Sequence, residues 1–165
     1  MRLVEREPAV PGPGEVRVRI VRSAVNPTDW KSREGVNGRT SAFPETVPNQ
    51  DGAGVVDAVG PEVADLAAGD RVWVTFAAIG RPTGTAQEFT VLPVGRVFRL
   101  PDGASFELGA DHGVPAVTAH RALTVAEDGP SQLEPGALAD RTVLVQGGAG
   151  AVDNAAIQLG RAVGG

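Results

Sequence analysis

The chain has 165 residues, of which 20 are acidic and 15 basic, so its formal net charge is −5. This acidic balance excludes a nucleic-acid binder held by a basic surface, because a row of phosphates needs cationic partners. The absence of cysteine excludes disulfides, thiolate nucleophiles and zinc sites with sulfur ligands.

The first hundred residues contain several short segments with the patterns of β-strands. At residues 15–22, apolar side chains alternate with arginines, which predicts a half-buried strand. Further β-branched or apolar runs, each bounded by glycine or proline, predict strands over residues 53–59, 71–76, 88–92 and 97–100. Short strands at this spacing favour a small barrel or sandwich.

The pattern changes after residue 100. Ser105 is a candidate N-cap for a short helix over residues 106–111, and the Gly-Val-Pro sequence at 113–115 is expected to interrupt it. Residues 116–126 predict a second helix, and residues 127–140 a polar loop.

The end of the chain has the pattern of strand, glycine turn and helix. Residues 142–146 form an apolar run typical of a buried strand, and glycines follow at once. Apolar side chains then recur at helical spacing, at Val152, Ala155, Ala156, Leu159 and Val163. In this context, backbone N–H groups at a helix N-terminus bind a dinucleotide diphosphate. The local sequence leaves open an alternative, a strand-to-helix turn without a ligand.

Asp153 departs from the glycine pattern of such sites. The spacing G-x-G-x-x-G would use Gly148, Gly150 and a third glycine at position 153. A carboxylate there suits the helix dipole but would repel a diphosphate. A complete mononucleotide-binding unit also needs a second parallel strand after the helix. We therefore expect only the start of a cofactor domain, in a chain shortened at both ends.

Six motifs occur in order along almost the whole chain. They are PGPGEV at 11–16, VNPTDW at 25–30, DGAGVV at 51–56, the stretch 63–72, GVPAVTA at 113–119 and the stretch 143–159. The series resembles the medium-chain dehydrogenase/reductase superfamily, and within it the zinc-independent quinone oxidoreductases. The resemblance implies a mostly β fold with some α structure. A GroES-like β-barrel that carries the substrate site would span residues 1–115. A connecting helix and an incomplete Rossmann α/β segment would span residues 116–165.

The resemblance also bears on metal binding. Zinc-dependent members carry a cysteine where this chain has Asn26, and Gly-His-Glu where it has the Asn-Gln-Asp sequence at 49–51. Amide side chains are poor zinc ligands beside thiolate and imidazole. The two histidines, His112 and His120, have no evident ligand cluster around them and are expected to be surface or packing residues. We therefore predict that the chain has no metal site.

Several site residues follow from the resemblance. Asn26 and Asp29 match residues of the substrate–nicotinamide cleft and are the candidate catalytic residues, Asn26 near the ring and Asp29 in support of its loop. The candidate cofactor-binding residues are Thr118, Gly147, Gly148, Ala149, Gly150, Ala151 and Val152. Structural alternatives stay open, because residues 26–29 are also good turn formers and Thr118 could bond back to its own helix. Asp51 is expected to be structural, and the absence of tyrosine excludes a phenolic proton donor.

The leading hypothesis is an NADPH-dependent oxidoreductase of the quinone reductase type, with direct hydride transfer to a quinone or enone and no zinc. Its partner would be that small molecule, not a nucleic acid or a membrane, and a homodimer is expected where the rest of the Rossmann half is present. No apolar run approaches the ~20 residues of a membrane span and no signal peptide is visible, so we expect a cytoplasmic protein. The alternative is a non-catalytic truncated reductase fragment, acting at most as a barrel-type interaction domain.

Overall fold

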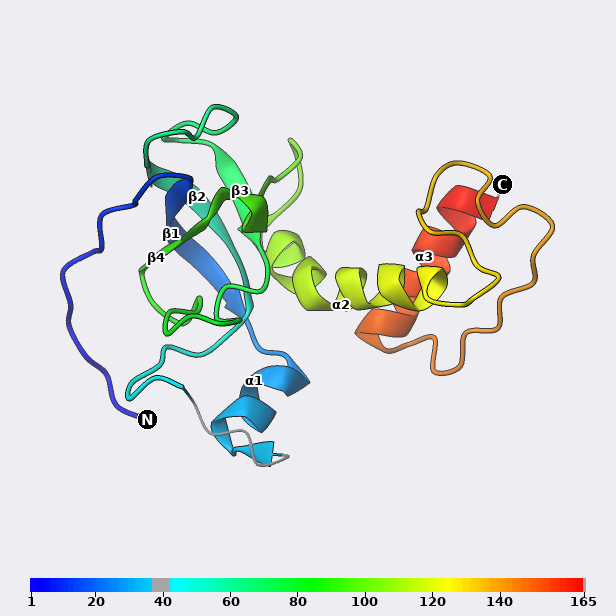
Figure 1. Cartoon of the computed structure of the whole chain (residues 1–165), viewed down its shortest axis with the longest axis horizontal. Helices are drawn as coiled ribbons and strands as arrows, with labels where there is room; N and C mark the ends of the chain where they lie inside the picture. Colours follow the sequence, from blue (N-terminus) through cyan, green and yellow to red (C-terminus); the bar gives the residue numbers. More distant parts are fainter. Residues whose placement is uncertain (37–41, 165) are drawn as a thin grey trace. The chain divides into compact units, whose positions relative to one another are not determined.

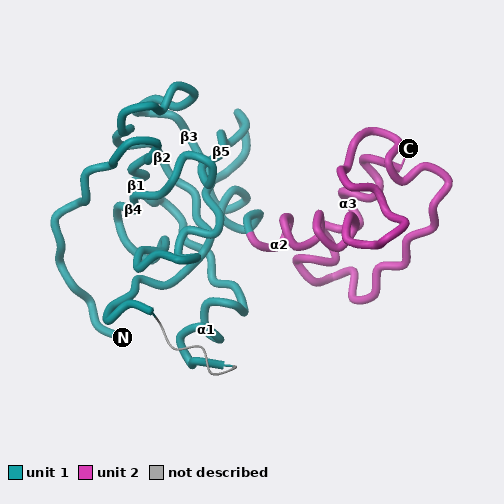
Figure 2. The backbone as a smooth tube through the Cα atoms, in the orientation of Figure 1, with its two compact units in different colours: residues 1–113 teal, residues 114–165 magenta. Residues whose placement is uncertain are grey.

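The computed structural model describes residues 1–36 and 42–164. The chain divides into two compact units, Met1–Gly113 and Val114–Gly165, which are coloured separately in Figure 2.

Five strands in the described part of the first unit form an antiparallel sheet, in the order β4-β1-β2-β3-β5. Figure 1 labels the first four of them, and Figure 2 labels β5 as well. They are β1 Glu15–Ala24, β2 Asp51–Val59, β3 Arg71–Val74, β4 Phe89–Pro93 and β5 Val97–Arg99, and a 3-10 turn, η2 Val94–Arg96, joins the last two. All the strands predicted for the first hundred residues are thus confirmed. β3 ends earlier than predicted, and Phe76 just beyond it has a φ of 54°, which a strand cannot accommodate.

The hydrophobic core of the first unit lies against the sheet. Val16 and Val18 of β1 are fully buried, whereas Arg17 between them forms an ion pair with Asp57 at 2.6 Å. The alternation therefore separates a core face from a polar face, as the sequence pattern predicts. Other buried core side chains come from the neighbouring strands, and they include Val56, Val72, Val74 and Leu92.

A short helix that the sequence analysis did not predict follows β1. This helix, α1, spans Pro27–Arg33, and Asn26 is its N-cap residue. The carboxylate of Asp29 accepts a hydrogen bond from the backbone N–H of Asn26 at 2.7 Å. A capping residue followed by proline and then an acid is a helix-start signal, and it overrides the turn alternative for residues 26–29.

The two helices predicted over residues 106–126 are one helix, α2 Phe106–Thr124, with Pro115 inside it. The predicted cap is confirmed, because Ser105 Oγ accepts the backbone N–H of Leu108 at 3.2 Å. The predicted interruption is wrong. Proline removes one backbone donor, but the helix continues through it, and Ala110 and Ala119 on either side of it are buried.

The second unit contains α3, Ala151–Gly164, which confirms the predicted C-terminal helix. Ala156 and Val163 of its apolar face are buried, and residues 127–140 form the predicted loop. The predicted strand over residues 142–146 is wrong, and its Leu144 side chain is 93% exposed. A strand needs a partner, and the described residues of this unit contain no other strand. In the described ranges, no helix combines the length and the apolar character that a bilayer crossing requires.

We predict that Leu92→Ala lowers the free energy of unfolding by about 2–5 kcal/mol, because it opens a cavity beside β1 in the core. The matched control is Leu144→Ala, which removes the same atoms from an exposed site and should change stability by less than about 0.5 kcal/mol. Chemical denaturation of the three proteins measures both values. Equal losses for the two variants would contradict the assignment of the core.

Candidate functional site

A cluster of buried polar side chains gathers where β1 leads into α1 and where β2 begins. Asn26, Asp29 and Asp51 are each less than 10% exposed. Thr75, just after β3, is also buried beside them. Three separate segments of the first unit thus contribute to one polar cluster.

Asp51 is the acceptor at the centre of this cluster. Its Oδ2 accepts a hydrogen bond from Asn26 Nδ2, and its Oδ1 accepts one from the Thr75 hydroxyl, both at 2.8 Å. Its backbone carbonyl accepts the hydroxyl of Thr85 at 2.6 Å. A fully buried carboxylate needs such partners, because burial without them would cost several kcal/mol. These bonds fix the amide of Asn26 in one orientation.

The first half of α2 covers the same carboxylate through a glycine. A Cβ atom added to Gly113 would lie 2.2 Å from Asp51 Oδ1, closer than any side chain can come. One turn earlier, a Cβ at Gly109 would lie 2.8 Å from Leu100 Cδ1 and 3.1 Å from the Cβ of Ala53. The two glycines, four residues apart on one helix face, let α2 approach the sheet closely. Glycine at 113 leaves the space that the carboxylate occupies.

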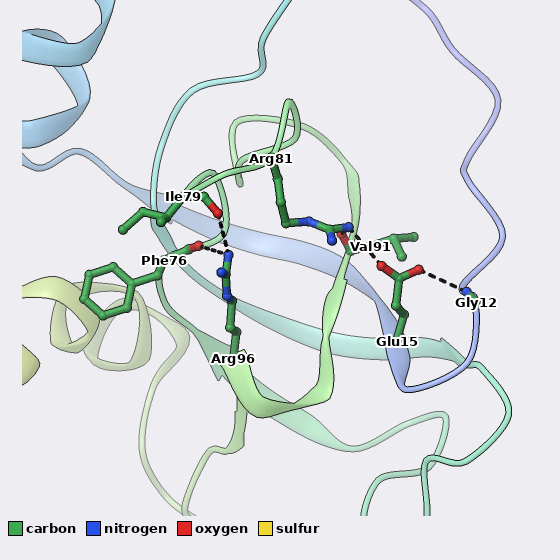
Figure 3. Close-up of polar contacts among 7 residues, drawn as sticks. All are labelled: Gly12, Glu15, Phe76, Ile79, Arg81, Val91 and Arg96. Atoms are coloured by element: carbon green, nitrogen blue, oxygen red, sulfur yellow. Dashed lines mark hydrogen bonds and ion pairs between the residues drawn. The ribbon is translucent and has the colours of Figure 1, made fainter. Parts of the chain in front are cut away.

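Two arginines hold the segment that follows β3 and carries the buried threonine (Figure 3). The guanidinium of Arg96 donates to the carbonyls of Phe76 and Ile79 at 2.7 and 3.0 Å. Arg81, at the other end of this segment, donates to the carboxylate of Glu15 on β1 at 3.0 Å. The segment is therefore tied to η2 near its start and to β1 near its end, which keeps its hydroxyl in place against Asp51.

The environment of Asp29 raises the pKa of its side-chain carboxyl. Burial raises the pKa of its carboxyl above the ordinary value of 3.8. The backbone N–H of Asn26 opposes this rise, the nearby charge of Asp51 adds to it, and the backbone N–H of Gln50 opposes it. The net result is a raised pKa, so Asp29 is easier to protonate in the folded protein than in the unfolded chain.

The donor set of the cluster does not fit a zinc ion. Asn26 uses its amide N–H toward Asp51, and the carboxylate of Asp51 is already bonded to that amide and to Thr75. Zinc sites in proteins use thiolates, imidazoles and free carboxylates. Within residues 1–36 and 42–164, no group of three or more histidine, cysteine or acidic side chains is placed to hold a metal.

The glycine loop before α3 contains its own carboxylate. A Cβ atom at Gly150 would lie 2.5 Å from Asp153 Oδ2, and one at Gly147 would lie 3.5 Å from the same atom. Gly147 has a φ of 82°, so its conformation also favours glycine. The loop as folded therefore does not fit a diphosphate, because Asp153 fills the space that the glycines leave.

The hydroxyl of Thr118 is bonded within its own helix. It donates to the carbonyl of Val114 at 2.7 Å, which is the structural alternative that the sequence left open. Thr118 and residues 147–152 both belong to the second unit, whereas Asn26 and Asp29 belong to the first. Of the candidate site residues, the structure brings Asn26 and Asp29 into direct contact.

Sequence reasoning missed two members of the cluster. Thr75 stands alone after β3, and nothing in its neighbourhood marks it as a partner of a buried acid. Gly113 lies in a recognised motif, but a Gly-Val-Pro sequence is typical of a helix break rather than of a helix contact. Its spacing of four from Gly109 is a signal of close helix packing that could have been used.

Comparisons with known proteins agree with this architecture. The family model described as alcohol dehydrogenase GroES-like domain matches residues 12–102. The chain is 38% identical over 156 residues to a synaptic vesicle membrane protein VAT-1 homolog from Rattus norvegicus, across 94% of this chain and 35% of that protein. It is 35% identical over 161 residues to a quinone oxidoreductase from Lama guanicoe, across 96% of this chain and 45% of that protein.

A solved structure with the same fold is the quinone oxidoreductase of Escherichia coli complexed with NADPH. Its TM-score is 0.66 at 27% identity, across 77% of this chain and 37% of that one. The chain spans less than half the length of each of these proteins. These matches confirm the predicted fold class, a GroES-like β-rich part followed by an incomplete Rossmann segment.

We predict that Gly113→Ala destabilises the protein by about 1–3 kcal/mol, because the new methyl group displaces the Asp51 carboxylate. The control is Gly160→Ala in α3, where an added Cβ meets no atom within 4 Å. This change should be neutral or stabilise by up to about 1 kcal/mol through helix propensity. Thermal or chemical unfolding distinguishes them, and a stabilising Gly113→Ala would show that the contact is absent.

We predict a pH-dependent difference between the native protein and Asp29→Asn. A carboxyl whose pKa is raised by folding contributes most to stability at low pH, and that contribution is lost as the pH rises through its folded pKa. The native free energy of unfolding, minus that of Asp29→Asn, should therefore be largest below pH 3.8, the ordinary carboxyl value, and should fall over the pH range above it. A difference that stays constant or rises over this range would contradict the raised pKa.

Proposed function

Because the chain belongs to the alcohol dehydrogenase GroES-like domain family, within the medium-chain dehydrogenase/reductase superfamily, we propose that it is an NADPH-dependent oxidoreductase of the quinone reductase type. The proposed substrate is a small quinone or enone, reduced without zinc. The likeness to quinone oxidoreductases, one of them complexed with NADPH, supports this proposal. This activity is proposed for the whole protein, to which this chain contributes the two units described above.

The observation that carries the proposal is the hydrogen bond from Asn26 to the buried Asp51. Asn26 stands where zinc-dependent members have a cysteine, and it is bonded to an acid rather than left open as a ligand. An amide held in this way can orient a bound molecule but cannot act as a Lewis acid. The cluster therefore favours a reduction in which the protein positions the reactants and excludes water.

Each unit has its own role in the proposal. Residues 1–115 form the substrate domain, in which Asn26 orients the substrate or the nicotinamide and Asp29 supports the first turn of α1. Residues 116–165 form the start of the cofactor domain, in which Thr118 and residues 147–152 would contact the cofactor once the Asp153 carboxylate turns out of the glycine loop. NADPH supplies hydride when it is bound, and water supplies the proton. The proposed setting is the cytoplasm, and the proposed oligomer is a homodimer.

A second candidate function rests on two observations in the second unit. Residues 142–146 form no strand, and Asp153 fills the glycine loop. Both favour a chain that binds no cofactor by itself and acts as a non-catalytic interaction domain. Binding of NADPH to the purified chain would favour the reductase, because the interaction domain needs no cofactor.

We predict that Asn26→Ala lowers kcat/KM for NADPH-dependent quinone reduction by roughly 10- to 100-fold, because the reactants lose an orienting group. The control is Asn154→Ala, which removes an exposed amide bonded to Gln158 and should leave the rate unchanged. The assay follows NADPH consumption by absorbance, with circular dichroism to verify folding. Equal rates in a folded Asn26→Ala variant would rule out a role in reactant positioning. A native chain that neither binds NADPH nor reduces quinones would favour the interaction domain.

A further inference from the structure

We propose that the carboxylate of Asp153 occupies the diphosphate position of the glycine loop and is the residue that limits dinucleotide affinity in this chain. The inference rests on the proposed cofactor function and goes further, because it assigns the strength of binding to one side chain. Asp153 stands where the third glycine of the G-x-G-x-x-G pattern would be, so the sequence and the structure point to the same residue.

Two glycines of the loop before α3 lie next to the Asp153 carboxylate. The Cβ positions of Gly147 and Gly150 both face Asp153 Oδ2, at 3.5 and 2.5 Å. In a dinucleotide site, the second glycine of the pattern, here Gly150, leaves the space that lets the backbone approach the diphosphate. Here the protein's own acid fills that space, from the first turn of α3.

The rest of the loop is held in place by other contacts. The N–H of Gly150 donates to the carbonyl of Gly147, and the N–H of Asn154 donates to the carbonyl of Gly150, both at 2.8 Å. A Cβ at Gly148 would lie 2.9 Å from Ile157 Cδ1, so the loop also packs against α3. The group that can move is therefore the half-buried side chain of Asp153, which must rotate away before a diphosphate can enter.

Charge acts in the same direction as space. The N-terminus of a helix attracts an anion, and Asp153 in the first turn already supplies one. A diphosphate in contact with this carboxylate would meet like-charge repulsion, which is strong where water is partly excluded. Removal of the charge alone should therefore recover part of the affinity, and removal of the whole side chain should recover more.

The test measures NADPH binding to the purified chain by calorimetry, with Asp153→Gly, Asp153→Asn and the control Asp140→Asn. Asp140 is an exposed acid in the same unit, and its φ of 59° is one that asparagine tolerates. We expect Asp153→Gly to bind NADPH at least tenfold more tightly than the native chain. Asp153→Asn should be intermediate, and Asp140→Asn should equal the native chain. Inorganic pyrophosphate, as a second probe, should give the same order.

The possible outcomes separate the inference from the function on which it rests. Saturable binding of NADPH with equal affinity in the native chain and Asp153→Gly overturns the inference and leaves the proposed function in place. A gain in Asp140→Asn as large as in Asp153→Gly also overturns it, because net charge would then explain the effect. If neither the native chain nor folded Asp153→Gly binds NADPH, the inference is overturned, and the non-catalytic interaction domain is the function favoured for this chain.

Discussion

The buried carboxylate of Asp51, at the start of β2, joins α1, the segment after β3 and α2 at one point of the first unit. It receives hydrogen bonds from the residue that caps α1 and from the threonine that follows β3, and the glycine face of α2 lies directly over it. A charge placed in the interior is stable only when its acceptors are filled, so each of these segments must keep its position. The geometry around Asn26 is thus a consequence of where Asp51 lies.

The second unit depends on a different constraint, because its glycine turn is filled by the acid of the helix that it precedes. Asp153 satisfies the helix dipole and packs against Gly147 and Gly150, so the turn is internally complete. The first unit therefore has a preformed polar cluster, whereas the second has a loop in which a ligand must compete with a side chain. The reductase proposal rests on the polar cluster of the first unit, whereas the filled loop of the second unit favours the non-catalytic interaction domain.

The strands of the first unit could be predicted from the sequence, because alternation such as that of Val16 and Val18 reports directly on burial. The helix α1 could have been predicted, since Asn26 and Pro27 are typical of a helix start. The continuity of α2 through Pro115 could not, because it depends on tertiary packing that overrides local preference. Within the cluster, Asn26 and Asp29 could be predicted as site residues only through the resemblance to the family. The partnership of Asp51 with Thr75 joins positions 24 apart, and no periodic pattern reports such a contact.

The exposed segment at residues 142–146 has a consequence for the behaviour of the purified chain. It has the sequence TVLVQ, which is uncharged, rich in β-branched residues and free of proline, and its Val143 and Leu144 are exposed. Exposed segments of this composition readily pair with the same segment of other chains and form intermolecular cross-β structure. The two outer strands of the sheet offer poorer templates, because β5 is three residues long and ends in Arg99 and β4 ends in Pro93. Aggregation in concentrated solution would therefore begin at residues 142–146, and the substitution of Leu144 by lysine would reduce it.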